Sequence, residues 1–254
     1  MLRLENITKR FGGLTVLNNI SFDLGTSGIT ALIGPNGSGK TTLARSITGL
    51  CQPDRGKIVF DGQEIQGLPP YRISRKGLVG TFQQPELFPH LSTLDNLLAA
   101  APRQTGEMIS SLFFYPGQID REERNNREEA EEILEMLSLK TQRDVMAGRL
   151  NFCKRKLLEI GRTLMAHPLL VLLDEPTAGV DPSLIGQLSL LIKEQRKKGI
   201  RFLLIEHNLS FVAALSERLM VMASGNLVFC GTPAEARSDK RVREVYSARS
   251  IDNA

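Results

Sequence analysis

The sequence predicts an α/β fold: a mainly parallel sheet, an antiparallel β-layer near the N-terminus, and an inserted helical subdomain. Three observations lead to this prediction. Short strand-like segments divided by turns open the chain, later apolar runs alternate with helical stretches, and the middle of the chain is mainly helical in pattern. With 254 residues, 41% of them hydrophobic, the chain is long enough to bury a full core.

The antiparallel layer is predicted from three short segments that Gly, Asn and Asp residues separate: Leu2–Ile7, Ile20–Leu24 and Lys57–Phe60. The parallel sheet is predicted from runs of a different kind. Ile29–Ile33 is a run of apolar residues interrupted only by Thr30, which is typical of a strand buried on both faces. Similar runs occur at Leu169–Leu173, Phe202–Ile205 and Leu219–Met222, with helical stretches between them.

The helical insert is predicted over residues 85–167, where leucines recur at helix-like spacing and Arg121–Leu137 becomes amphipathic after a charged stretch. The whole chain, 1–254, is then a single domain. Residues 1–84 and 168–254 would form its α/β core. A last helix is expected after Thr232, because Pro233 at the first helical position and Glu235 at the third complete a capping pattern.

Composition excludes several classes of function. The net charge is +4 and both signs are mixed along the chain, so nucleic-acid binding has little support. Cys51, Cys153 and Cys230 lie far apart and suggest neither a disulfide framework nor a zinc site, as expected in a reducing cytosol. No run approaches the roughly 18–20 apolar residues of a membrane span, and no signal-peptide pattern follows Met1. We therefore expect a cytosolic protein whose membrane role, if any, depends on a partner.

A phosphate-binding loop follows the first buried strand. The segment matches the pattern G-x-x-x-x-G-K-[ST] in full, and a helix is predicted after it. Its glycines would let backbone N–H groups surround a polyphosphate, and the helix would point its positive end at the same oxygens. Lys40 would reach the β- and γ-phosphates and Thr41 would coordinate Mg²⁺, and Thr42 joins the nucleotide-binding candidates. The segment is Gly34-Pro35-Asn36-Gly37-Ser38-Gly39-Lys40-Thr41.

An acidic pair follows a second buried strand. Asp174 and Glu175 come directly after Leu169–Leu173, and the carboxyl ends of parallel strands are where open α/β sheets bind ligands. Asp174 would hold Mg²⁺, directly or through water, and Glu175 would orient a water for attack on the γ-phosphate. By itself the pair could merely end a strand with solvated charges. Beside a phosphate loop it predicts a nucleotide hydrolase.

These residues, with those that follow them, resemble the ATP-binding subunits of ABC transporters over essentially the whole chain. The family's elements stand in the family's order: the Q-loop as Thr81-Phe82-Gln83, the Walker B end as Asp174-Glu175-Pro176-Thr177, the D-loop as Ala178-Gly179-Val180-Asp181, and the switch histidine as His207 after Glu206. Within the family the sequence looks most like the ATPase subunits of branched-chain amino acid importers. The features that suggest it are Gly80-Thr81-Phe82-Gln83, the insert Ser111–Arg127, and the tail from Gly231 to Tyr246.

The resemblance implies further roles. Gln83 would sense Mg²⁺ and the attacking water and link the site to a membrane partner, His207 would contact the γ-phosphate, and Phe11 would stack on adenine. Each of these residues also has a plain structural interpretation. Asp181, for example, precedes Pro182 and could serve only as a helix N-cap.

The sequence departs from the family at the signature segment, usually Leu-Ser-Gly-Gly-Gln, which here is Leu150-Asn151-Phe152-Cys153-Lys154. In the family this segment begins a helix whose N-terminus presses on the γ-phosphate held by the opposite subunit. Asn151 can still donate a hydrogen bond where Ser would. A Cβ and a sulfur at Cys153 would instead push the phosphate away. Two hypotheses follow: a heterodimer whose other subunit has an intact signature, which we favour, or a homodimer with weak activity.

The resemblance thus implies an ATP- and Mg²⁺-dependent ATPase that dimerises head to tail on the cytoplasmic side of the cell membrane and drives an integral-membrane permease. Three alternatives remain open at this point: an exporter or lipid-extraction ATPase, a soluble ABC ATPase without a membrane partner, and an ATP-gated binding module with weak hydrolysis.

Overall fold

The structure is a computed structural model that describes residues 1–81, 85–102 and 116–247. The chain forms two compact units, each described here by itself. The first comprises Met1–Gly80, Leu169–Thr177 and Ile192–Ala254, and the second comprises Thr81–Pro168 and Ala178–Leu191. The predicted single domain with an insert over residues 85–167 stays a prediction.

The first unit contains an antiparallel sheet built from the N-terminal part of the chain. Its strands lie in the order β2-β1-β4-β5, and every neighbouring pair is antiparallel. The predicted antiparallel layer is therefore present, with longer strands than the sequence suggested. The strands are β1 (Leu2–Phe11), β2 (Leu14–Asp23), β4 (Arg55–Phe60) and β5 (Gln63–Glu64).

The first unit also contains a six-stranded sheet in the order β10-β9-β3-β8-β7-β6. All neighbours are parallel except the edge strand β10, which pairs antiparallel with β9. The residues of β3 and β7 are buried throughout, which explains why both strands are apolar except at Thr30 and Asp174. The strands are β3 (Ile29–Ile33), β6 (Leu78–Gly80), β7 (Leu170–Asp174), β8 (Arg201–Ile205), β9 (Arg218–Ala223) and β10 (Asn226–Gly231).

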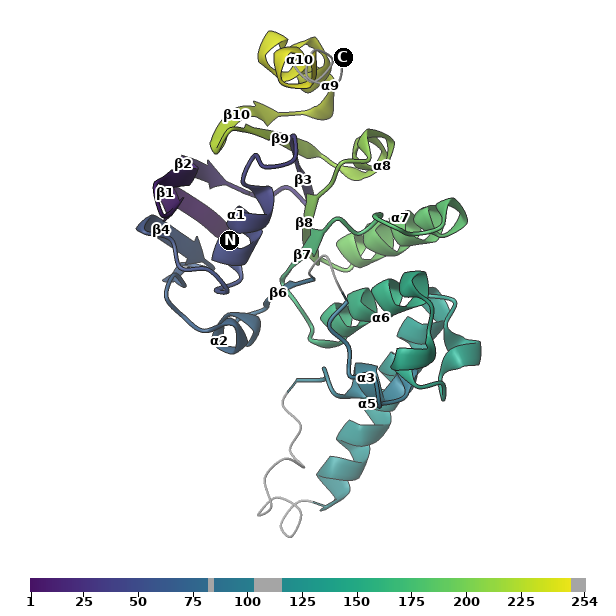
Figure 1. Ribbon diagram of the computed structural model, residues 1–254. Coiled ribbons are helices and arrows are strands. Elements are labelled where there is room, and N and C mark those ends of the chain that lie inside the picture. Colours follow the sequence, from purple (N-terminus) through teal and green to yellow (C-terminus); the bar gives the residue numbers. More distant parts are fainter. Residues whose placement is uncertain (82–84, 103–115, 248–254) are drawn as a thin grey trace. The chain divides into compact units, whose positions relative to one another are not determined.

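Helix α1 (Lys40–Ile47) lies between the two sheets of this unit (Figure 1). Its buried residues Leu43, Ala44 and Ile47 join side chains from both sheets in one hydrophobic cluster. Packing α1 into this core fixes the helix start, and so the loop before it, relative to the large sheet. The remaining helices of the unit are α2 (Pro70–Ser74), α8 (Leu209–Leu215), α9 (Pro233–Ser238), α10 (Lys240–Ser247) and the C-terminal part of α7 (Pro182–Lys197).

The predicted capping pattern at the last helices is confirmed. The Thr232 side chain accepts from the N–H of Glu235, and the Glu235 carboxylate accepts from the N–H of Thr232, which makes a complete capping box at α9.

The second unit is helical, as its leucine spacing predicts, with Leu94, Leu97, Ile133 and Leu134 buried. Leu91 precedes the first of these helices and is partly exposed. The elements are α3 (Thr93–Leu98), α5 (Pro116–Met136), the short 3₁₀ turns η2 (Lys140–Gln142) and η3 (Ala147–Arg149), α6 (Phe152–Met165), and the N-terminal part of α7. Helices α3, α5 and α6 pack against one another.

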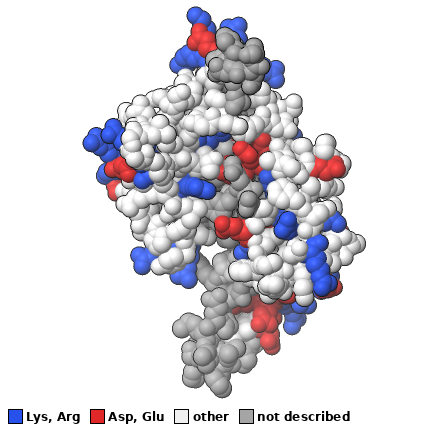
Figure 2. Space-filling view, in the orientation of Figure 1, with Lys and Arg blue, Asp and Glu red and all other residues white. Residues whose placement is uncertain are grey.

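On the face drawn in Figure 2, basic and acidic side chains of the described residues are interspersed, as the mixed sequence charge suggests. No helix in the described part of the chain combines the length and the apolar character that a membrane span requires.

Candidate functional site

Three neighbouring strands of the large sheet deliver the predicted catalytic residues to one edge. Strand β8 pairs with β3 on one side and with β7 on the other, all parallel. The phosphate loop follows β3, the acidic pair ends β7, and His207 follows β8. Because parallel strands end at the same edge of a sheet, residues far apart in sequence meet there.

The phosphate loop takes a conformation that its glycines permit. Gly34, Gly37 and Gly39 all have positive φ, at 154°, 77° and 102°. A Cβ on Gly34 would lie 2.2 Å from the carbonyl oxygen of Met222, on the neighbouring strand β9. The loop therefore requires glycine at its first position for steric reasons, before any ligand is considered.

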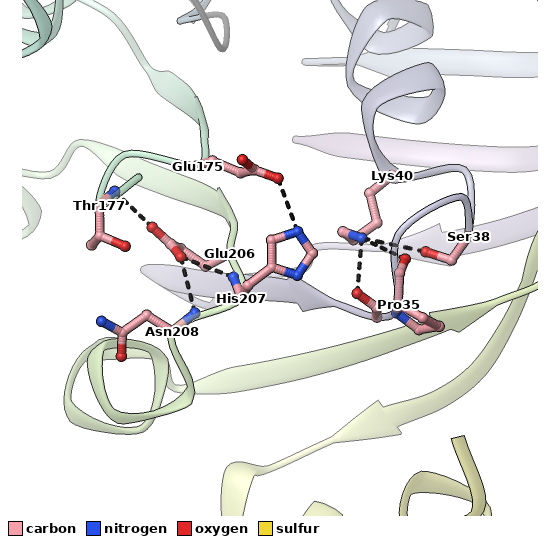
Figure 3. Close-up of polar contacts among 9 residues, drawn as sticks. Pro35, Ser38, Lys40, Glu175, Thr177, Glu206, His207 and Asn208 are labelled. Carbon is pink, nitrogen blue, oxygen red and sulfur yellow. Dashed lines mark hydrogen bonds and ion pairs between the residues drawn. The ribbon is translucent and has the colours of Figure 1, made fainter. Parts of the chain in front are cut away.

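Lys40 is held inside this loop. Only 5% of it is exposed, and its Nζ donates to the carbonyl oxygens of Gly34 and Pro35, each at 2.9 Å (Figure 3). Helix α1 begins at this lysine, and its N-cap, Gly39, offers no side chain to accept from the first amides. The loop thus presents a lysine and the positive end of a helix together, the combination that suits a polyphosphate.

Glu175 and His207 face each other at the ends of β7 and β8. The His207 Nε2 lies 2.9 Å from the Glu175 Oε1, and both side chains are partly exposed (Figure 3). Glu175 has φ of 51°, rare for a residue with a side chain, and its N–H donates to the Ile205 carbonyl. A left-handed non-glycine residue is strained by about 1–3 kcal/mol, and such strain concentrates at functional positions. Here the strained backbone carries the predicted water-orienting carboxylate.

Asp174 and Thr41 supply oxygen donors of the kind that Mg²⁺ prefers. Asp174 is the last residue of β7, 2% exposed and paired with Ile205 of β8. Thr41 is the second residue of α1, directly after Lys40. Together with the glycine-lined loop, this donor set is compatible with a magnesium–nucleotide complex.

Glu206 belongs to this edge of the sheet, and our sequence analysis gave it no role of its own. Glu206 comes directly after β8, at the same end of the sheet at which Asp174 ends β7, and it is 2% exposed. Its carboxylate accepts three backbone N–H groups. The signal that could have identified it is the one that identified Asp174, a carboxylate directly after a buried apolar run.

The signature segment lies in the second unit, where it contacts the predicted D-loop. Asn151 is the N-cap of α6, and its Oδ1 accepts from the N–H of Lys154 at 2.9 Å. The Cys153 Sγ lies 3.0 Å from the carbonyl oxygen of Gly179. The Phe152 ring packs so closely that a Cβ on Gly179 would lie 2.9 Å from it. The residues that depart from the family pattern are therefore engaged within the chain itself.

The remaining candidates are distributed as follows. Asp181 caps α7: its Oδ1 accepts from the N–H of Ser183 at 2.9 Å and from its hydroxyl at 2.7 Å, and these hydrogen bonds lower the pKa of Asp181. Phe11 ends β1 and is half-exposed, with the Lys9 Nζ 5.3 Å from its ring centre. Gln83 lies outside the described residues. Metal-binding and catalytic roles for all these residues stay predictions.

The chain is similar to known proteins over almost its whole length. The model of the family described as "ABC transporter" matches residues 17–178. The branched-chain amino acid transport ATP-binding protein BraF of Pseudomonas aeruginosa is 36% identical over 97% of each chain. A probable LivG of Archaeoglobus fulgidus is 38% identical over 97% of this chain and 95% of that one. The lipopolysaccharide export ATP-binding protein LptB of Haemophilus influenzae is 31% identical over 97% and 96%.

Solved structures give the same result. A nucleotide-free ATP-binding cassette from an ABC transporter superposes with a TM-score of 0.80 at 38% identity, over 97% of this chain and 98% of that one. A cassette in its ADP conformation superposes with a TM-score of 0.78 at 35% identity over the same shares. The predicted fold class and the resemblance to the branched-chain type of subunit are confirmed. The chain belongs to the ABC transporter family, and it is an ATPase subunit of that family.

Proposed function

We propose that this subunit binds Mg-ATP in the loop of Gly34–Thr41 and hydrolyses it to drive a membrane permease that imports branched-chain or related amino acids. The observation that carries the proposal is the shared sheet edge: the lysine-bearing phosphate loop, the buried Asp174 and the facing pair of Glu175 and His207. The substrate class rests on the BraF and LivG relatives.

Lys40 grips the terminal phosphates. Its ammonium donates to two loop carbonyls, and an anionic phosphate oxygen is a stronger acceptor than a carbonyl. The loop amides and the N-terminus of α1 hold the same phosphates from the backbone side. In this arrangement Phe11, half-exposed at the end of β1, stacks on the adenine.

Glu175 orients the attacking water, and His207 contacts the γ-phosphate. The His207 Nε2 lies within hydrogen-bond distance of the Glu175 Oε1, at 2.9 Å, and this contact keeps the two groups within reach of one reacting centre. The Thr41 hydroxyl and the Asp174 carboxylate would hold Mg²⁺, and Gln83 would be a further ligand. When bound, the ion would neutralise the negative charge that develops on the phosphate oxygens.

A dimer completes the site in this proposal. Asn151 and Cys153 of one subunit face the nucleotide held by the other, and Asp181 lies at the same interface. The partner is an ABC ATPase, of a different chain in the form we favour, and both subunits attach to the permease at the cytoplasmic face of the membrane.

The test is to co-express the subunit with candidate permeases, purify the complex and reconstitute it in vesicles. We expect magnesium-dependent ATP turnover and ATP-driven uptake of a branched-chain amino acid. Turnover coupled to extraction of a lipid, the activity that the LptB relative suggests, would replace the importer with an exporter. The absence of ATP binding by the purified subunit would contradict the proposal as a whole.

A further inference from the structure

The Glu206 carboxylate gathers backbone amides from two loops of the first unit. Its Oε1 accepts from the N–H of Thr177 at 2.7 Å, in the loop after β7 (Figure 3). Its Oε2 accepts from the N–H of His207 at 2.9 Å and of Asn208 at 3.1 Å, in the loop after β8. One buried carboxylate therefore joins the ends of two adjacent strands.

These contacts complete a closed ring around the catalytic pair. Glu175 is joined through Pro176 to Thr177, whose N–H is bound by Glu206. Glu206 is joined covalently to His207, whose imidazole returns to the Glu175 carboxylate at 2.9 Å. A ring of this kind restricts the distance between Glu175 and His207 more tightly than their own hydrogen bond could, because each loop is fixed at its base.

The ring is also anchored in the fold. The N–H of Glu206 donates to the carbonyl of Leu32, in the strand that leads to the phosphate loop. Beyond His207, the Asn208 side chain caps α8 by accepting from the N–H of Phe211 at 3.0 Å. The loop that carries His207 is thus fixed on both sides.

We infer that Glu206 is a positioning residue for ATP hydrolysis: it acts through His207 and holds the imidazole against Glu175. This inference rests on the proposed function, since it gives the ring a role in that reaction. A carboxylate suits the position because both of its oxygens accept and three donors face it. A Gln at the same position has one accepting oxygen, so its NH₂ group would face the amides of one of the two loops.

The kinetic test is a double-mutant cycle with Glu206→Gln and His207→Ala. In the otherwise native complex, Glu206→Gln should lower kcat by about tenfold and change KM by less than about twofold, since buried amides lose their acceptor while the phosphate loop is untouched. In the His207→Ala background the same substitution should have almost no further effect. An equal loss of kcat in both backgrounds, or a normal kcat in Glu206→Gln, overturns the inference.

A matched control separates this effect from general destabilisation. Glu217 also accepts a backbone N–H, that of Gly28 at 3.0 Å, and it pairs with Arg196 in the same unit. Glu217→Gln should leave kcat unchanged. If Glu206→Gln fails to fold, Glu206→Asp replaces it in the cycle. The Asp side chain keeps the charge but is too short to reach both loops.

A second readout does not depend on turnover. The chain has three histidines, so the imidazole nitrogen resonances of His207 can be assigned by NMR. The Nε2 resonance should move in Glu206→Gln toward its position in Glu175→Ala, and should stay in place in Glu217→Gln. An unmoved resonance in Glu206→Gln overturns the inference even if the protein hydrolyses ATP. If the resonance moves in Glu206→Gln but the native complex does not turn over ATP, the result supports the ring and contradicts the proposed function.

Discussion

The chain contains two helix N-termini that the sequence associates with nucleotide, and they are built in opposite ways. Helix α1 begins after Gly39, which has no side chain to accept from the first amides. Helix α6 begins after Asn151, whose Oδ1 accepts from the N–H of Lys154. No side chain caps the first amides of α1, whereas the Asn151 side chain caps one of the first amides of α6.

The residues around the two helix N-termini also differ in how far they bond to their own chain. Lys40 lies in a loop whose glycines have positive φ, at the same end of the sheet as the Glu175 and His207 pair. At α6, the Cys153 Sγ meets the Gly179 carbonyl and the Lys156 Nζ donates to the Ala178 carbonyl at 3.0 Å. The phosphate loop therefore ends at a helix N-terminus without a side-chain cap, as a loop that binds a ligand requires. The signature segment makes hydrogen bonds within its own chain. In the proposed dimer it therefore has fewer free donors for the nucleotide held by the opposite subunit.

The largest effect is expected from Glu175→Gln, in the region that contains the phosphate loop. The Gln oxygen can still accept from His207, so the geometry is retained while the negative charge is lost. ATP turnover should fall by about 10²–10⁴-fold, the usual contribution of a general base. ATP should still bind, and the ATP-bound dimer should persist. Steady-state hydrolysis and size-exclusion chromatography in Mg-ATP measure both, with Glu217→Gln as control; normal turnover would show that Glu175 lacks the assigned role.

Lys40→Ala should come next, because it removes the ammonium on which the phosphate loop depends. A charge-assisted hydrogen bond contributes about 1.5–3 kcal/mol, so ATP affinity should fall by about 10- to 150-fold. Calorimetric titration with Mg-ATP measures this. The control is Lys57→Ala, which removes an exposed lysine paired with Glu64 in the same unit. Equal affinity in Lys40→Ala and the control would place the nucleotide elsewhere.

Cys153→Gly tests the signature segment at the start of α6. It removes the sulfur that contacts Gly179 and lets the backbone approach a phosphate closely. Because a helix N-terminus contributes about 0.3–1 kcal/mol to a nearby anion, ATPase activity of the assembled complex should rise by about two- to fivefold. Nucleotide binding by the isolated subunit should not change. Cys51→Ala is the control, and an unchanged rate in Cys153→Gly would mean that the cysteine does not weaken the signature.

The smallest effect concerns a helix with a side-chain cap far from the nucleotide residues in sequence. Asp239 precedes α10 and accepts from the N–H of Arg241 at 2.8 Å. The side chain of Arg241 hydrogen-bonds the Asp239 carboxylate and lowers its pKa to about 2. Since this pKa is depressed in the folded protein, the stabilisation is present above the unfolded pKa, about 4, and is lost as the pH falls toward 2.

Asp239→Asn should therefore lower the melting temperature slightly, and by the same amount at pH 7 and pH 5. The difference from the native protein should shrink only below about pH 4. Thermal unfolding at a series of pH values measures this. A difference that already shrinks between pH 7 and pH 5 would show that another group is responsible.

The local sequence alone determined much of this protein. The phosphate loop could be identified because its glycines, lysine and threonine lie in one short segment, and the buried strands could be identified because each is mainly an apolar run. The capping box at Thr232 was predictable for the same reason, since its partners are three residues apart. The helix cap at Asn151 was not predicted: its Oδ1 accepts from the N–H of Lys154, and the donation expected from its amide group toward a phosphate stays a prediction.

Only the tertiary structure decided the contacts that join distant segments. The pairing of Glu175 with His207 and the amides gathered by Glu206 depend on β7 lying beside β8, an order that no local pattern specifies. The contact between Cys153 and Gly179 likewise spans 26 residues. Residue type and spacing fix what a segment can do by itself. Which segments meet is fixed by the burial of whole strands and helices, and that is a property of the complete fold.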